Sequence, residues 1–98
     1  MDEPAARQVG RAQRGDPVAF DELADRWRRV IAAWCFLRTG DRETAEELAQ
    51  EVLLKAWQGL PALREVGAFP GWLAAITRRE CASWRSEEHT SELQSPNT

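Results

Sequence analysis

The sequence has little of what membrane-bound or secreted proteins need. No apolar run in its 98 residues approaches the ~20 residues of a membrane-spanning helix. The first residues are acidic and lack the apolar core of a secretory signal. We therefore expect a cytoplasmic protein without a membrane partner.

Residues that catalyse reactions or hold metals are also scarce. The single histidine, His89, lies close to the end of the chain, and the sequence has no Ser/His/Asp set and no glycine-rich phosphate loop. Cys35 and Cys81 fit no metal-ligand spacing, and a disulfide is not expected in a cytoplasmic chain. Both stand among apolar residues, so we expect them to be small buried side chains. These absences predict a binding protein without cofactor or metal, and exclude the usual enzyme classes.

Residues 86–98 differ in composition from the rest of the chain. They carry three of the 16 acidic residues and none of the 13 basic ones, so they account for the whole net charge of −3. Residues 85–95 resemble the in-frame translation of a common sequencing-library adapter. We therefore expect residues 86–98 to be a disordered, artefactual segment, with a natural disordered tail as the alternative. If the segment is artefactual, His89 has no role and the natural sequence after Arg85 is missing.

The first half of the chain predicts two helices. Residues 1–4 should be frayed, and residues 5–14 form a short helix that is anchored by Val9 and ended by Gly15. Asp16 followed by Pro17 is a strong start signal for a second helix, which runs to about Arg38. Apolar residues recur in it at steps of three and four, as a buried helix face requires: Phe20, Leu23, Trp27, Val30, Ile31, Trp34 and Cys35.

The central stretch, residues 40–57, predicts a third amphipathic helix. Gly40 can end the preceding helix, Asp41 can cap the new one, and Gly59 and Pro61 end it. One face is an apolar stripe, made of Ala45, Leu48, Ala49, Val52, Leu53 and Ala56. The opposite face is mostly acidic, and its Glu51 and Lys55 stand four residues apart, as an ion pair on a helix does. Such a face is usually only solvated, so on physical grounds alone this is an ordinary surface helix.

A loop over residues 60–67 leads to a last helix over about residues 69–85. Its apolar face holds Phe69, Trp72, Leu73, Ile76 and Trp84. Glu80 falls near the middle of that face, and burying a lone carboxylate is costly. We expect Glu80 to be more than half buried or to pair with an arginine. The four helices and short joints predict one all-α domain over residues 5–85, a small four-helix bundle.

The motifs in this order resemble conserved region two of an RNA polymerase sigma factor of the extracytoplasmic-function (ECF) type. The likeness covers about residues 9–85. It is carried by Gly15-Asp16 with Ala19-Phe20, Gly40-Asp41, Ala45-Glu46-Glu47-Leu48, Gln50-Glu51-Val52, Lys55-Ala56-Trp57, Phe69, Trp72-Leu73 and Ile76. Each motif alone is weak, but together, in this order and spacing, they are specific.

The resemblance implies two binding jobs in transcription initiation. The central helix would dock on the clamp helices of the large subunit of core RNA polymerase, through Glu47, Gln50, Glu51 and Lys55. The loop and last helix would recognise and melt the minus-ten promoter element, by capturing a flipped base of the non-template strand. The residues implied are Leu63, Arg64, Glu65, Val66 and Gly67 for the base pocket and Trp72, Arg78, Arg79 and Ser83 along the helix. An anti-sigma partner and the promoter sequence are left open.

Several positions depart from the family pattern. The family often has Asn where Arg79 stands, Asp near Ser83 and an apolar residue at Glu80, so base preference is in doubt. For Trp72, a core position competes with DNA contact. The segment that reads the minus-thirty-five element is absent, so we expect that this chain does not initiate transcription alone. The alternative function is an unrelated DNA-binding regulator of the helix-turn-helix class, which would need a recognition helix that projects polar residues.

Overall fold

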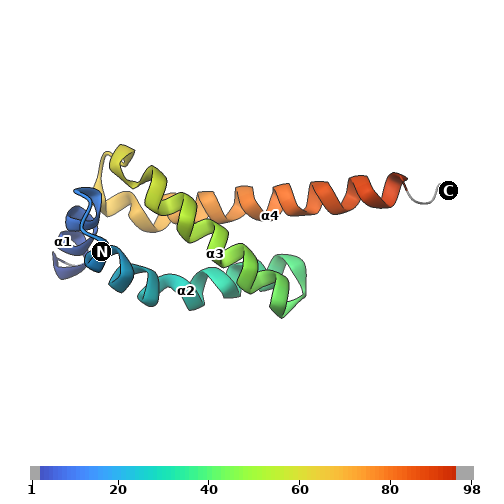
Figure 1. The fold of residues 1–98 in the computed structure, drawn as a ribbon, viewed down its shortest axis with the longest axis horizontal. Coiled ribbons are helices and arrows are strands. Elements are labelled where there is room, and N and C mark those ends of the chain that lie inside the picture. Colours follow the sequence, from blue (N-terminus) through green and yellow to red (C-terminus); the bar gives the residue numbers. More distant parts are fainter. Residues whose placement is uncertain (1–2, 95–98) are drawn as a thin grey trace.

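The computed structural model describes residues 3–94 of the chain, with side chains described up to residue 86. Its elements are α1 (Glu3–Gln13), α2 (Pro17–Thr39), α3 (Arg42–Gly59), the 3₁₀ turns η1 (Leu60–Ala62) and η2 (Val66–Ala68), and α4 (Phe69–Gln94). The described part contains no strand, so the predicted all-α, four-helix architecture is confirmed (Figure 1). Helix α1 begins at Glu3, earlier than predicted, because Pro4 is tolerated in a first turn.

The helix boundaries around α2 follow the local signals in the sequence. The Asp16 carboxylate accepts hydrogen bonds from the backbone N–H groups of Val18 and Ala19, at 3.1 and 3.3 Å. Gly40 ends the helix with a left-handed φ of 73°, a conformation that suits glycine. Asp41 then caps α3 by accepting from the backbone and hydroxyl of Thr44. These caps satisfy helix-end groups that would otherwise lack partners.

The core lies where α3 crosses between α2 and α4, with α1 closing one end (Figure 1). All six residues of the predicted α3 stripe are buried. They meet buried side chains from every other helix, including Val9, Leu23, Ile31, Leu60 and Leu73. Each large apolar side chain contributes about 1.5–3 kcal/mol on burial, whereas an exposed ion pair contributes about 0–1 kcal/mol. Apolar packing therefore holds the bundle together.

The predicted α2 stripe is only partly correct. Leu23, Ile31 and Cys35 are buried, and Phe20, Trp27 and Trp34 are half-buried and packed against the core. Val30, however, is 38% exposed, and its assignment to the buried face is wrong. Helix α2 spans 23 residues and is covered by different partners along its length. The same face of the helix is therefore not buried from one end to the other.

Cys35 on α2 and Cys81 on α4 are both buried free thiols, as predicted. Burial raises the pKa of Cys35 to about 12, and the neighbouring Cys81 thiol is the second cause of this rise. One turn further along both helices, the Arg85 guanidinium donates to the backbone carbonyl of Arg38 at 3.2 Å. These contacts fix where α2 and α4 face each other.

Helix α4 continues beyond its predicted end at Arg85. The helix runs to Gln94, and Figure 1 shows this part extending past the other helices. The reason is local, because the sequence offers no glycine or proline after Arg85 until Pro96. Residues 95–98 of the predicted disordered segment lie outside the described residues. Its assignment as artefactual stays a prediction.

Candidate functional site

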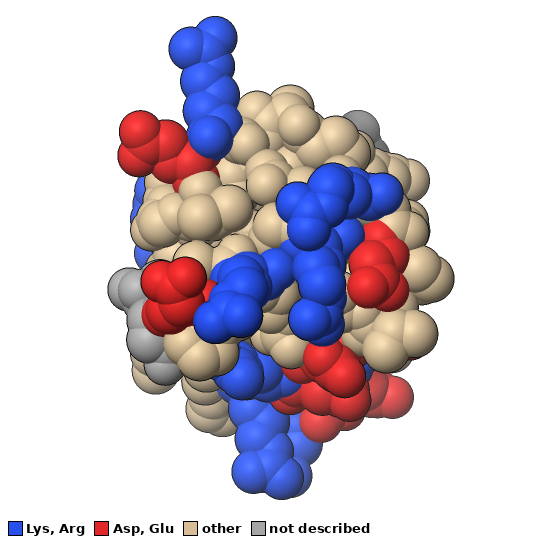
Figure 2. Space-filling model, turned by 90° about the vertical axis from the view of Figure 1, so that its left-hand side faces the viewer, with Lys and Arg blue, Asp and Glu red and all other residues tan. Residues whose placement is uncertain are grey.

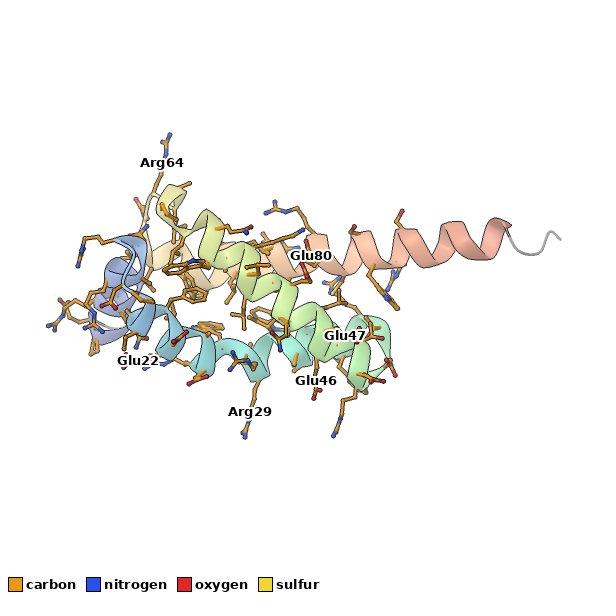
Figure 3. All side chains as sticks on the ribbon, viewed as in Figure 1. Glu22, Arg29, Glu46, Glu47, Arg64 and Glu80 are labelled. Atoms are coloured by element: carbon orange, nitrogen blue, oxygen red, sulfur yellow. The ribbon has the colours of Figure 1, made fainter. Side chains whose placement is uncertain are left out.

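The outer face of α3 presents the four residues expected to bind a partner. Glu47, Gln50, Glu51 and Lys55 are all exposed. A shallow hollow of about 460 Å³ is lined by Glu43, Glu46, Glu47, Gln50 and Glu51. Figure 3 shows Glu46 and Glu47 near the start of α3. Within the described part of the chain, Glu47 and Gln50 make no side-chain hydrogen bond or ion pair, so their polar groups are available to a partner.

Lys55 has a different ion-pair partner from Glu51, the one that its spacing predicts. Its Nζ atom lies 2.6 Å from Oε2 of Glu80, which reaches it from α4. This hydrogen bond and the charge of Glu80 raise the pKa of Lys55, while Glu51 makes a smaller contribution. The Glu80 side chain is 14% exposed, so the expectation that it is more than half buried is confirmed. Its partner is this lysine and not the arginine that we considered.

The loop between α3 and α4 is held by α1. Gln13 donates from Nε2 to the carbonyl oxygens of Leu60 and Leu63, at 3.2 and 2.7 Å. Gln13 was not predicted, because a glutamine near a helix end gives no local sign of a distant acceptor. Leu63 and Val66 are half-buried against the core, whereas Arg64, Glu65 and Gly67 are exposed. Of the five predicted pocket residues, the two apolar ones thus face inward and the other three face solvent.

Trp72 packs at the junction of this loop and α4. Its ring centroid lies 5.8 Å from that of Phe69, and the indole covers the backbone at Gly59 closely enough that a Cβ there would lie 3.4 Å from it. The side chain is half-buried, so it helps to build the core and still keeps part of its surface accessible.

Basic side chains gather on one end of the molecule and along α4. Figure 2 looks at the end formed by α1 and the loop, where blue basic groups cluster between acidic ones. Exposed arginines of α1 and the loop belong to this end: Arg7, Arg11, Arg14 and Arg64. Arg11 is already engaged, at 3.7 Å from Asp16 and 3.8 Å from Glu22. Further along, Arg78, Arg79 and Ser83 are exposed on α4, as DNA contacts require.

An apolar groove between α2 and α3 adjoins the acidic face and was not predicted. Its lining is mostly apolar, with Pro17, Phe20, Ala24, Leu53, Leu54 and Trp57, and also includes Asp21, Arg28 and Gln50. Leu54 is 51% exposed, and the Phe20 and Trp57 rings pack at 4.9 Å. The one signal in the sequence was an apolar residue, Leu54, on the otherwise polar side of the α3 wheel.

Clustered metal ligands and membrane-spanning helices were not found among the described residues. No group of three or more His, Cys, Asp or Glu side chains among them could hold a metal ion. None of the helices in the described part is long and apolar enough to cross a bilayer.

Comparison with known proteins identifies relatives across most of the chain. Residues 23–89 match the family described as Sigma-70 region 2. The chain is 30% identical, over 91% of its length, to "Probable RNA polymerase sigma factor RfaY" of Xanthomonas campestris pv. campestris. It is 32% identical, over 81%, to "ECF RNA polymerase sigma factor SigG" of Mycobacterium tuberculosis, and 31% identical, over 91%, to "ECF RNA polymerase sigma factor BldN" of Streptomyces coelicolor.

The matches cover only part of each relative. The chain spans 22% of the RfaY sequence, 20% of the SigG sequence and 36% of the BldN sequence. No solved structure gives a significant match. The family match covers more than half of the chain and sets aside the alternative of an unrelated helix-turn-helix regulator. The chain therefore belongs to the sigma-70 region 2 family of RNA polymerase sigma factors, with relatives of the ECF type.

Proposed function

We propose that this chain is the sigma factor domain that binds core RNA polymerase and recognises and melts the minus-ten promoter element during transcription initiation. In this role it binds its partners and performs no catalytic step. The acidic face of α3 docks on the clamp helices of the large polymerase subunit, while the loop and α4 bind the non-template strand.

The main support for the proposed polymerase binding is the contrast between the two faces of α3. Every residue of the apolar stripe is buried, whereas Glu47, Gln50 and Glu51 remain exposed around a common hollow. An acidic surface of this kind steers onto a basic helical surface and selects against acidic ones. The neighbouring groove at Leu54 adds apolar area to the same side of the molecule.

The DNA half is supported by chemistry around the loop and α4. Arg64, Arg78 and Arg79 are exposed and can neutralise phosphates, while the partly accessible Trp72 can stack on a base. Extruding a base costs a few kcal/mol, and contacts in a shaped pocket must offset this cost. A loop that is held in place can form such a pocket. The two Gln13 hydrogen bonds hold the carbonyls at one side of that loop.

The first experiment measures binding of the full chain to a recombinant clamp-helix fragment of the large polymerase subunit. We expect Glu51→Arg to weaken binding at least about tenfold, which corresponds to ~1.4 kcal/mol. Glu65→Arg carries the same charge change on the loop and serves as the matched control. Equal losses for both variants, or no binding by the unaltered chain at high micromolar concentration, would contradict the proposed docking face.

A further inference from the structure

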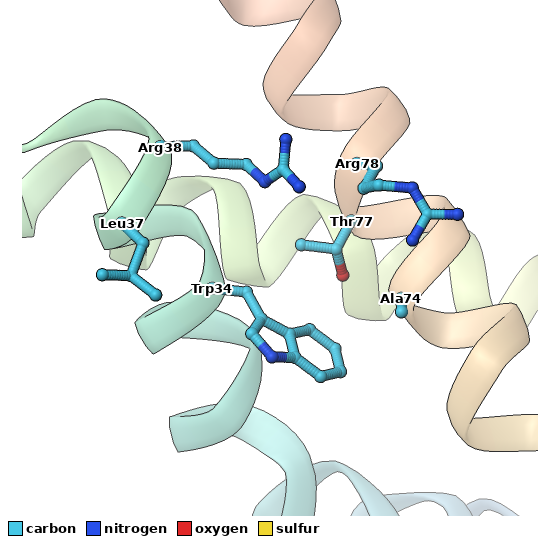
Figure 4. Close-up of a pocket in the computed structure, with 6 residues that line it drawn as sticks. All are labelled: Trp34, Leu37, Arg38, Ala74, Thr77 and Arg78. Atoms are coloured by element: carbon cyan, nitrogen blue, oxygen red, sulfur yellow. The ribbon is translucent and has the colours of Figure 1, made fainter.

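A hollow between α2 and α4 has no role so far, although one of its lining residues, Arg78, belongs to the proposed DNA-contacting face. It has a volume of about 310 Å³ and is lined by Trp34, Leu37, Arg38, Ala74, Thr77 and Arg78. Figure 4 shows the Trp34 indole reaching from α2 toward Ala74 and Thr77 of α4, with the Arg38 and Arg78 side chains on either side of Thr77. This volume lies at the lower end of the ~300–1,000 Å³ range of small-ligand pockets.

The walls of the hollow combine a fixed aromatic surface with an uncovered apolar rim. Trp34 is half-buried and packs against Trp27, with ring centroids 6.2 Å apart, so its indole is held from behind. Leu37 is 82% exposed, the largest exposure among the exposed large hydrophobic side chains in the described part of the chain. A ligand with a flat apolar surface would cover both side chains.

The charge around the hollow is of one sign. Its charged lining residues are Arg38 from α2 and Arg78 from α4, and no acidic side chain lines it. Arg85 adds a third guanidinium nearby, because it donates to the carbonyl of Arg38. The nearest acidic residue on α4, Glu80, is held by Lys55 of α3. The site therefore suits a flat, apolar group that carries negative charge at its edge.

We propose that this hollow binds an unpaired nucleotide of single-stranded DNA, with the base against Trp34 and the phosphate between Arg38 and Arg78. The inference rests on the proposed DNA-binding function and adds a second nucleotide site to it. Arg78 already belongs to the proposed DNA-contacting face, so a strand that follows α4 passes the rim. Base stacking on an aromatic side chain contributes about 1–3 kcal/mol and tolerates any base.

The hollow is separate from the pocket at the loop. From Phe69, where α4 leaves the loop, to Thr77 the helix rises about 12 Å, at ~1.5 Å per residue. At ~3.4 Å per nucleotide along one strand, this is roughly three to four nucleotides. One strand can therefore occupy both sites with different nucleotides.

The test uses the full chain and a fluorescein-labelled single-stranded oligodeoxynucleotide of mixed sequence, with binding followed by anisotropy. We expect Trp34→Leu to lower affinity about 5- to 150-fold, the loss of one stacked base. Trp57→Leu is the matched control, since Trp57 is another half-buried tryptophan but packs on Phe20 between α2 and α3. It should change affinity less than about twofold. Circular dichroism establishes that both variants are helical.

A second variant keeps the inference testable if Trp34→Leu does not fold. Arg38 is exposed, so Arg38→Gln leaves the core intact. It should reduce the slope of log affinity against log salt concentration by about 0.7, the value for one phosphate contact on a single strand. An unchanged slope, or equal losses for Trp34→Leu and Trp57→Leu, overturns the inference.

Other outcomes separate this inference from the proposed function. If Arg79→Glu weakens binding of the oligonucleotide and Trp34→Leu does not, the proposed function stands and the second site is wrong. If the unaltered chain does not bind the oligonucleotide at all, both DNA proposals fail, while the polymerase test is unaffected. If the hollow binds an acidic peptide and no DNA, the nucleotide assignment is overturned.

Discussion

Burial of the Cys35 thiol between α2 and α4 links its protonation to folding. With a pKa of about 12 in the folded chain, against about 8.5 in an unfolded one, the thiol keeps its proton in the native state where the unfolded state has lost it. The unfolded state then binds fewer protons, so its free energy falls relative to the native state as pH rises. The chain has no tyrosine, and Lys55, whose raised pKa gives a slope of the same sign, is present in both proteins compared below.

We therefore expect the contribution of the Cys35 thiol to the free energy of unfolding to be constant below about pH 8.5. It should fall as pH rises toward 12, by up to ~1.4 kcal/mol per pH unit. Urea titrations between pH 8 and 10.5 measure this slope. Cys35→Ala should be less stable throughout but should show a shallower slope. Parallel slopes for the two proteins would show that the thiol does not titrate differently on folding.

Single residues also show the limit of sequence reasoning. The prediction that Glu80 cannot remain both buried and unpaired follows from the cost of burying a charge, and this part was correct. The identity of its partner was not predictable, because spacing along one helix favours Glu51 as the neighbour of Lys55. Only the crossing of α3 over α4 brings Glu80 within 2.6 Å of Lys55.

Between elements, the Lys55–Glu80 ion pair joins the helix proposed to bind polymerase to the helix proposed to bind DNA. Lys55→Met leaves a carboxylate that is 14% exposed without its cation, so we expect the melting temperature to fall by a few degrees. The double variant Lys55→Met, Glu80→Leu removes both charges and should recover most of that loss. Thermal melting followed by circular dichroism compares them, with Glu51→Gln as a control on the same helix. A double variant less stable than either single one would count against this account.

Helix boundaries were predictable where a local signal sets them. The caps at Asp16 and Asp41 and the left-handed Gly40 depend on residues within one turn, and all three were correct. The end of α4 has no such signal after Arg85, so composition alone gave the wrong boundary. Val30 was placed wrongly because burial along a long helix depends on where its neighbours end.

For the whole molecule, the packed core ends well before the chain does. Among the side chains that the structure describes, up to residue 86, the last buried core residue on α4 is Cys81, with Trp84 packed against the core, and the helix then extends past the bundle (Figure 1). We expect a chain that ends after Arg85 to melt within about 2 °C of the full chain, since surface changes away from the core usually have small effects. Its net charge would be near zero instead of −3. Calorimetry of both chains at equal pH and salt is the measurement, and a drop of more than about 5 °C would mean that residues after Arg85 stabilise the bundle.

The two proposed interfaces differ in how well they can be predicted from the sequence alone. The acidic face of α3 lies on a single helix, so its periodicity is enough to collect Glu47, Gln50 and Glu51 on one side. The hollow at Trp34 is made by residues of α2 and α4 that meet only in the folded molecule, and the sequence placed Trp34 simply in the core. Gln13 was missed for the same reason, since its acceptors lie in a loop far along the chain.

The order of packing along the chain also bears on how quickly the fold forms. Helix α1 packs on α2, α2 on α3 and α3 on α4, so most of the bundle is built from neighbours in sequence. Domains with such local contacts fold in roughly microseconds to milliseconds. Synthesis proceeds at about 5–20 residues per second, so the α2–α3 hairpin can form while later residues are still being added. The acidic face of α3 would then be presented before the last helix has left the ribosome.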